Sequence, residues 1–282
     1  MKLASYRTRE GSDFGIVVGD GIISLKGRLA RSHQSLVDLL ASGSLDLAKE
    51  IQSSLDPDVR MSEVEFLPVI PHPGKFLAIG INYREHAEQI GRTIAARPTL
   101  FSRFPDTLVG HRQPMNRPRV SSYLDFEGEL AVIVGRAGRY IPEANAMEHI
   151  AGYACFVDGS VRDYQKQSTT AGKNFPSTGP FGPWMVTRDE IPDPRRMILT
   201  TRLNGQIMQQ AGVEMMIHPI PALVSYVSEI TPLQPGDVIS TGTPGGVGHR
   251  RQPPVWLKPG DTLEFEISGI GTLTNTVVDE NA

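Results

Sequence analysis

Short apolar runs that end at glycine, proline or aspartate recur along the chain and limit the folds open to it. The clearest runs are Phe14–Asp20, Phe76–Ile81, Glu127–Gly135 and Ile150–Val157. Runs of this length between turn residues are typical of β-strands. The 28 glycines and 22 prolines are spread along the whole sequence. Leu233–Thr241 and Leu257–Phe265 each contain Pro-Gly-Asp, a tight turn that launches a strand. The sequence therefore predicts a protein rich in β-sheet.

Two stretches favour helices, and a proline-rich segment divides the chain. Ser35–Ile51 carries apolar residues at near-helical spacing, and Ile220–Ile230 is typical of a short helix. Leu67–Lys75 holds three prolines and a glycine, so it continues neither a helix nor a central strand. We therefore predict a small N-terminal α/β unit over 1–66 and a main domain over 67–282. The fold class is expected to be α+β, mainly β, with strands in a sandwich or roll.

Composition excludes several functions. Lys plus Arg number 28 against 31 for Asp plus Glu, a balance that argues against a nucleic-acid-binding protein. No stretch approaches the roughly 20 apolar residues of a membrane span, and the first residues lack the apolar core of a secretory signal. A cytoplasmic protein is the expectation. The single cysteine, Cys155, excludes an internal disulfide and a multi-cysteine metal site.

Acidic residues alternate just before the most apolar run. Asp125, Glu127 and Glu129 are two residues apart, so in a strand they share one face. Three like charges beside a core need compensation, and oxygen ligands point to Mg²⁺, Mn²⁺ or Ca²⁺. The alternative is a solvated strand edge. Asp158 follows another buried run, where acids often border a site, although Asp-Gly is also a common hairpin turn.

The segment Asp125–Gly135 resembles the metal-binding strand of the fumarylacetoacetate hydrolase (FAH) family. The resemblance implies that Glu127, Glu129 and Asp158 form a three-carboxylate site for Mg²⁺ or Mn²⁺, with Ca²⁺ as a substitute in vitro. Other segments also match in order, namely Ile79–Ala87, Thr99–Pro105, Gly152–Gln165, Gly172–Trp184, Leu203–Gly205, Leu233–Asp237 and Thr241–Gly248. Ordered matches are more specific than one motif. They imply an FAH-type mixed β-sandwich roll after the small N-terminal unit.

The resemblance also implies the chemistry. Its substrates are small keto acids, and cleavage of a C–C bond beside a carbonyl leaves a carbanion that a Lewis-acidic metal stabilises as an enolate. The leading prediction is a hydrolase of acylpyruvate-like or 1,3-diketo acids, a homodimer with a place in aromatic catabolism. The alternative is a decarboxylase, lyase or isomerase acting on a β-keto acid such as oxaloacetate.

Individual roles follow from the same resemblance. His86 is the expected base, with Lys173 and Gln89 as further catalytic residues. The expected substrate-binding residues are Tyr83, Arg103, Arg162, Gln165 and Thr243. Gln89 stands where family hydrolases carry a glutamate, and glutamine can orient a histidine but supplies no charge. This departure favours lyase or isomerase chemistry. Residues 210–216 lack the polar groups of the family and are expected to form an apolar wall around a less polar distal group of the substrate.

Two hypotheses from other classes remain. Gly242–Gly248 is rich in glycine, but a dinucleotide-binding loop needs a helix after it, and residues 249–256 contain two prolines. A non-catalytic binding protein is the other hypothesis. The intact acidic residues argue against it, whereas Gln89 argues mildly for it.

Overall fold

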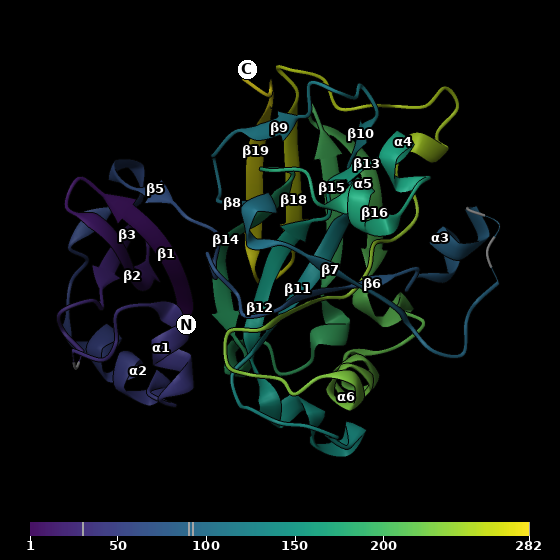
Figure 1. Ribbon diagram of the computed structural model, residues 1–282. Helices are drawn as coiled ribbons and strands as arrows, with labels where there is room; N and C mark the ends of the chain where they lie inside the picture. Colours follow the sequence, from purple (N-terminus) through teal and green to yellow (C-terminus); the bar gives the residue numbers. More distant parts are fainter. Residues whose placement is uncertain (30, 90, 92, 282) are drawn as a thin grey trace.

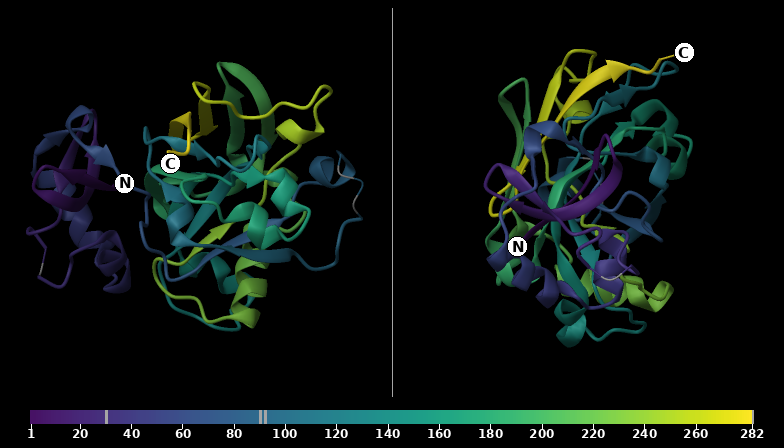
Figure 2. Two further views of the ribbon diagram at one scale, coloured as in Figure 1. Left: turned by 45° about the horizontal axis from the view of Figure 1, so that its top comes forward. Right: turned by 90° about the vertical axis from the view of Figure 1, so that its left-hand side faces the viewer.

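The computed structural model describes residues 1–282 except 30, 90, 92 and 282. A small N-terminal lobe lies beside a larger domain of two packed sheets (Figure 1). The elements of the lobe are β1 Lys2–Thr8, β2 Gly11–Val18, β3 Gly21–Ser24, α1 Leu36–Ala41, α2 Leu45–Ser54, β4 Val59–Arg60 and β5 Glu65–Phe66. The left view of Figure 2 shows the same lobe set to one side.

The main domain is built mostly from strands, as the sequence predicts. Its strands are β6 Phe76–Gly80, β7 Thr99–Arg103, β8 Leu108–Val109, β9 Met115–Arg117, β10 Leu124–Asp125, β11 Gly128–Val134, β12 Ile150–Val157, β13 Ser160–Val161, β14 Gly179–Thr187, β15 Ile198–Leu203, β16 Gln206–Gly212, β17 Val238–Ser240, β18 Thr262–Ile267 and β19 Gly271–Asp279. Its helices are α3 Arg84–Gln89, α4 Arg162–Gln165, α5 Thr169–Lys173 and α6 Ile220–Ile230.

The large sheet runs through both parts of the molecule in the order β4-β3-β2-β1-β14-β12-β11-β17-β6-β7. The join is antiparallel pairing of β1 with β14, with Lys2 opposite Val186 and Leu3 opposite Met185. A second sheet has the order β16-β15-β18-β19-β9, and β10 pairs with β13. The α+β, mainly β class is confirmed. The domain division at residue 66 stays a prediction.

Strand β11 is buried on both of its faces, which explains its unbroken apolar run. Leu130 and Val132 belong to the core between the two sheets. Ala131 and Ile133 belong to a second core, which the helices of the N-terminal lobe also share. Successive side chains of a strand point to opposite faces. Glu127 and Glu129 therefore continue the face of Ala131, at the point where this second core gives way to polar side chains.

The local predictions largely hold. Helix α6 and strand β12 have the predicted bounds, and residues 67–75 form neither helix nor strand. Strands β17 and β18 follow turns in which Gly236 and Gly260 have φ of +85° and +89°. The single helix expected over Ser35–Ile51 is wrong. Gly43, with φ of +68°, ends α1 in the left-handed conformation that glycine favours, and α2 begins afresh.

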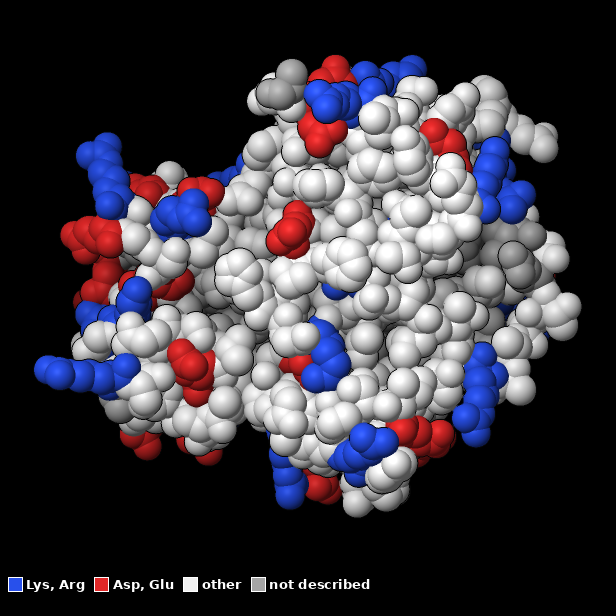
Figure 3. Space-filling view, in the orientation of Figure 1, with Lys and Arg blue, Asp and Glu red and all other residues white. Residues whose placement is uncertain are grey.

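Charged side chains are scattered over the face of the molecule shown in Figure 3. On the face in Figure 3, acidic and basic side chains are interspersed, without a continuous basic patch. None of the described helices is long and apolar enough to cross a membrane.

Candidate active site

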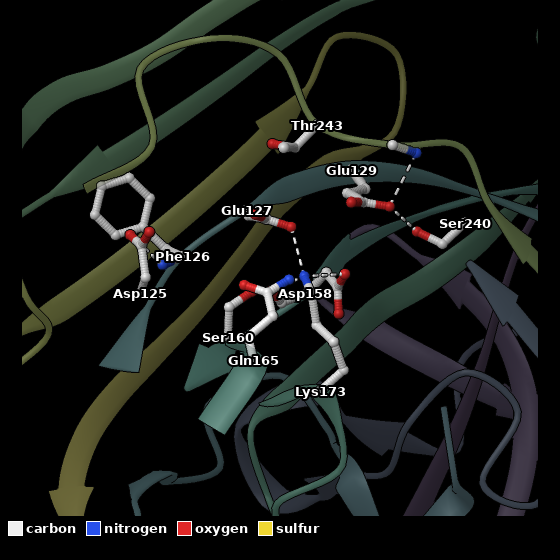
Figure 4. A network of polar contacts seen from close by, with 12 residues as sticks. Asp125, Phe126, Glu127, Glu129, Asp158, Ser160, Gln165, Lys173, Ser240 and Thr243 are labelled. Carbon is white, nitrogen blue, oxygen red and sulfur yellow. Dashed lines mark hydrogen bonds and ion pairs between the residues drawn. The ribbon is translucent and has the colours of Figure 1, made fainter. Parts of the chain in front are cut away.

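Three buried carboxylates meet at the ends of β11 and β12. Glu127 precedes β11, Glu129 lies on it, and Asp158 directly follows β12. The two strands pair with Glu129 opposite Phe156, and the Asp158 N–H donates to the Glu127 carbonyl at 2.8 Å. All three residues are buried, and one carboxylate oxygen from each lies within 4.8 Å of the others. Figure 4 shows the three side chains converging.

Asp125 does not join this cluster, so the expectation that it shares their face is wrong. The chain leaves the strand between β10 and β11, and the two parts pair with different neighbours. The Asp125 carboxylate instead accepts the backbone N–H groups of Gly248 and His249 at 2.8 and 3.1 Å. It also accepts Nε of Arg162 at 2.8 Å. Figure 4 places it to one side of the other acids.

Three cations surround two of the carboxylates. Lys173 Nζ donates to Glu127 at 2.6 Å and to Asp158 at 2.5 Å. Arg162 donates to Glu127 at 2.6 Å, and Arg103 donates to Asp158 at 2.5 Å. Burial raises the pKa of Glu127, but Arg162 and Lys173 outweigh burial and hold that pKa below its ordinary value. Glu127 is therefore a stable anion in the metal-free protein.

Glu129 has a different environment. Its Oε2 accepts the hydroxyl of Ser240 and, at 3.0 Å, the N–H of Gly242. No hydrogen bond to Oε1 and no ion pair to Glu129 is found among the described residues. Burial, then the charges of Asp158 and Glu127, raise its pKa well above the ordinary value. A cation bound between the three acids would relieve this repulsion, so the donor set fits a hard divalent metal ion.

The carboxylates form part of the wall of a cavity of about 560 Å³. The charged and histidine side chains on its wall are Glu127, Glu129, Asp158, Arg162, Lys166, Lys173, Arg250, His86 and His249. Gln165 and Thr243 also line it. A cavity of this size accommodates a small organic acid. The wall combines acidic side chains that can hold a metal ion with basic side chains around them. This combination suits an anionic ligand.

His86 faces this cavity, and no acidic side chain among the described residues hydrogen-bonds it. It lies on the six-residue helix α3 and is buried, and its Nδ1 has no hydrogen-bond partner within the described part of the chain. Gln89 is exposed and turned away, because its Oε1 accepts the N–H of Gly246 at 3.1 Å. Burial lowers the pKa of His86, and the attraction of Glu127 only partly offsets this effect. The catalytic role of Gln89 stays a prediction, and its geometry favours anchoring the Gly246 loop.

Residues 75–278 match the family model described as Fumarylacetoacetate (FAA) hydrolase C-terminal. The chain belongs to this family. Oxaloacetate tautomerase FAHD2A, mitochondrial, from Bos taurus is 35% identical over 266 residues, which cover 92% of this chain and 85% of the relative. The family predicted from the sequence is thereby confirmed.

Two solved structures extend the comparison. The 5-carboxymethyl-2-hydroxymuconate delta-isomerase from Mycobacterium smegmatis is 32% identical with a TM-score of 0.77. Maleylpyruvate hydrolase from Sphingobium sp. SYK-6, in complex with manganese(II) and pyruvate, is 26% identical with a TM-score of 0.84. Both matches cover 100% of each chain. The FAH fold is therefore confirmed, while the three names describe three different reactions.

The structure divides the predicted substrate-binding residues of this FAH-family enzyme into two groups. Arg162, Gln165 and Thr243 line the cavity. Tyr83 packs in the core, and its hydroxyl has no partner among the residues described. Arg103 lies behind Asp158, where its guanidinium also donates to the Gly159 carbonyl and the Thr178 hydroxyl. The geometry of Arg103 therefore favours positioning Asp158 over touching the substrate.

The expected apolar wall over 210–216 is not part of this cavity. None of these residues is among the described side chains that line it. Val213 and Met216 pack into the core between the sheets instead, and Met215 is exposed. The reason is that β16 ends at Gly212 on the edge of the second sheet. These substitutions therefore give no reason to expect a less polar substrate.

Sequence reasoning missed Gln209 and His249, and also the exposed cations Lys166 and Arg250 of the cavity wall. Gln209 is buried, accepts the Gly128 N–H at 3.0 Å and donates to the Thr243 hydroxyl at 2.8 Å. His249 lines the cavity with its Nδ1 2.9 Å from the Asp125 carboxylate. One signal was available, because His249 directly follows the matched segment Thr241–Gly248.

Proposed function

We propose that this FAH-family enzyme is a metal-dependent keto–enol tautomerase of an oxaloacetate-like dicarboxylic 2-keto acid. The observation that carries the proposal is the isolation of His86. Its ring faces the cavity, and no carboxylate hydrogen-bonds it in the described structure. Such a histidine can move a proton to or from a carbon atom. Within the described residues it has no acidic partner that would help it to activate water for hydrolysis.

The metal-binding part of the proposal rests on the carboxylate cluster. Glu127, Glu129 and Asp158 would hold one Mg²⁺ or Mn²⁺ ion, which would supply Lewis-acid polarisation of a chelated 2-keto carboxylate. Lys173 would turn from the carboxylates toward the bound anion when the metal ion takes its place. Burial holds Glu129 in position, together with the hydrogen bonds that its carboxylate accepts from Ser240 and Gly242.

The charges on the rest of the wall favour a substrate with two carboxylates. Lys166 and Arg250 are exposed at the cavity, and neither forms an ion pair within the described residues. One carboxylate and the keto oxygen would lie at the metal site. The second carboxylate would then reach these two free cations. Relatives named oxaloacetate tautomerase support the same substrate class.

The proton chemistry falls to His86. In the keto form the carbon between the carbonyl and the second carboxylate carries an acidic C–H bond. His86 takes this proton, the C–H electron pair forms the C=C bond, and the former carbonyl oxygen gains a proton. The reverse sequence converts the enol into the keto form. The lowered pKa of His86 keeps its ring neutral and basic at neutral pH.

A second candidate is hydrolysis of a C–C bond in an acylpyruvate, the leading prediction from the sequence. One observation favours it, namely the full-length likeness to a maleylpyruvate hydrolase that holds manganese(II) and pyruvate. Decarboxylation of oxaloacetate needs the same metal site without the activated water.

The homodimer, the cytoplasmic location and the place in aromatic catabolism stay predictions.

One set of assays, run with Mg²⁺ or with a chelator, distinguishes tautomerisation, C–C bond hydrolysis and decarboxylation. We expect the ultraviolet absorbance of enol-oxaloacetate to decay faster with enzyme and Mg²⁺ than without, and the acceleration to vanish in chelator. Pyruvate release from oxaloacetate and from acetylpyruvate should stay at background. Rapid pyruvate release from acetylpyruvate, with enol decay at the uncatalysed rate, would refute the tautomerase proposal.

A further inference from the structure

A buried aspartate and a histidine form a pair at the cavity that the mechanism above does not use. The Asp125 side chain is fully buried, and its Oδ2 lies 2.9 Å from Nδ1 of His249. His249 is carried by the 3₁₀ turn Gly248–Arg250, and its side chain is 20% exposed toward the cavity. The two residues are 124 positions apart in the sequence, so the contact is made by the fold.

The Gly248–Arg250 turn is built closely against Asp125. The backbone N–H groups of Gly248 and His249 both donate to its carboxylate. A Cβ atom at Gly248 would lie 2.5 Å from Oδ1 of Asp125 and 2.1 Å from the Val255 carbonyl oxygen, so only glycine permits this approach. The position of the His249 ring is therefore fixed by both backbone and side-chain contacts.

The hydrogen bonds around Asp125 determine how the ring is oriented. The N–H groups of Gly248 and His249 and the Nε of Arg162 all donate to the Asp125 carboxylate. Asp125 is therefore an acceptor surrounded by donors, so Nδ1 of His249 carries the hydrogen in this contact. Nε2 is then the ring nitrogen left to exchange a proton with a bound molecule, and no hydrogen bond to it is found among the described residues. An acid that orients and stabilises a histidine in this way is a recurring catalytic arrangement.

The cavity thus holds two histidines with different surroundings. His86 has no acidic partner within the described chain, whereas Asp125 would stabilise the positive charge of a protonated His249. A histidine held by a carboxylate is suited to give a proton to oxygen, and a histidine without such a partner can take a proton from carbon. The two rings therefore divide the two proton transfers of a tautomerisation.

We propose that His249, held by Asp125, is the second proton carrier of this enzyme and exchanges a proton with the substrate's carbonyl oxygen. The inference rests on the proposed tautomerase function. As His86 takes the proton of the C–H bond, that electron pair forms the C=C bond. The π pair of the carbonyl moves onto oxygen, which takes the Nε2 proton of the imidazolium form of His249 and leaves that ring neutral with its hydrogen on Nδ1. In the opposite direction each transfer is reversed, and solvent water restores the starting protonation of both rings. Asp125 acts as a positioning residue.

The test uses His249→Asn in the full-length enzyme with Mn²⁺. The asparagine amide can replace Nδ1 as a donor to Asp125, but nothing replaces Nε2. We expect kcat for enol-oxaloacetate to fall about 10²-fold, with KM and the affinity for oxalate unchanged. His249→Ala should recover part of its lost rate when imidazole is added. The matched control is His72→Asn, at an exposed histidine outside the cavity, which should behave as wild type.

Two outcomes would overturn the role of His249 alone. One is a His249→Asn variant with the wild-type kcat, measured beside an active wild-type enzyme. The other is a loss of oxalate binding equal to the loss of rate, without imidazole rescue, since the residue would then only support the site. A wild-type enzyme that does not accelerate enol decay at all would overturn the tautomerase function itself, and this role with it.

Discussion

The floor and the rim of the cavity are built in different ways. The floor consists of Glu127, Glu129 and Asp158, which paired strands of the large sheet hold in the buried interior. The rim carries His86 on a short helix and His249 on a 3₁₀ turn, both outside the sheets. Strands between two cores fix a metal site firmly, whereas short surface segments can change without disturbing the fold. We infer that the floor defines the shared enolate chemistry of the family and that the rim selects the reaction.

The largest expected effect is at the floor, with Glu129→Gln. The glutamine oxygen can still accept from Ser240 and Gly242, so the change removes charge and little else. We expect kcat with Mn²⁺ to fall about 10³-fold, because the metal loses an anionic ligand worth several kcal/mol. The raised pKa of Glu129 shows that its charge is unfavourable in the metal-free protein. In chelator the variant should therefore melt at a higher temperature than wild type.

Both effects are measured by enol decay and by thermal melting with Mn²⁺ or chelator. Glu143→Gln, at an exposed position, is the control and should change neither quantity. A Glu129→Gln variant that Mn²⁺ stabilises as strongly as wild type would show that the floor does not hold the metal.

The next effect is at the rim, with His86→Gln. We expect tautomerase kcat to fall about 10²-fold, since a positioned general base contributes at least this factor, while Mn²⁺ still stabilises the protein. The pH dependence sharpens the comparison. Because the pKa of His86 is lowered from its ordinary 6.5, the ring stays neutral as the pH falls past that value. The acidic limb of the rate profile should lie below pH 6.5, and a limb above it would argue against His86 as the base.

A third histidine lies away from the cavity and should affect stability alone. His111 packs edge-on against Phe66, with ring centroids 5.4 Å apart, and its Nδ1 accepts the Thr274 N–H. Burial, with the charge of Arg112, lowers the pKa of His111 to about 4. The unfolded chain therefore binds this proton first as the pH falls. The stabilisation is complete above pH 6.5 and is lost as the pH falls toward 4.

We expect this loss to be about 2 kcal/mol, after discounting for partial exposure of the ring. Urea unfolding of wild type and His111→Gln between pH 7 and pH 4.5 measures it. The variant should lose less stability over this range, with tautomerase kcat at pH 7 close to wild type. Equal losses in the two proteins would show that His111 is not the group responsible.

The smallest expected effect is at Gln89→Glu, which restores the residue of family hydrolases. The side chain at this position is exposed and faces Gly246, so the new carboxylate should bind that N–H and leave His86 unaffected. We expect acylpyruvate hydrolysis to change by about twofold at most, as for other surface substitutions. The rate of acylpyruvate hydrolysis is measured as pyruvate release. A tenfold higher rate in the variant would show that residue 89 contacts His86 during turnover. The rim would then resemble that of family hydrolases more closely than this structure indicates.

The floor could be predicted from the sequence because its signals are local. Alternating acids before an apolar run predict that Glu127 and Glu129 point to the same side where β11 begins, and the match to the family adds Asp158. The alternating pattern gave a wrong prediction for Asp125, because periodicity does not reveal where a strand breaks. Helical spacing gave a wrong prediction at Gly43, where one glycine separates two helices although the apolar spacing continues through both.

The rim could not be predicted in the same way, because its contacts join distant parts of the chain. The ring of His249 is held in position by Asp125, and the side chain of Gln89 is held by Gly246. The direction in which Arg103 points depends on β7 passing behind Asp158. Each of these relations is set by tertiary packing, for which neither spacing nor composition carries a signal.

The most direct test of the metal site is anomalous X-ray scattering from crystals grown with Mn²⁺ and oxalate. The account predicts one strong manganese peak at the floor, within bonding distance of an oxygen from each of Glu127, Glu129 and Asp158, with oxalate completing its coordination. A crystal with oxalate in the cavity and no manganese among these three carboxylates would contradict it.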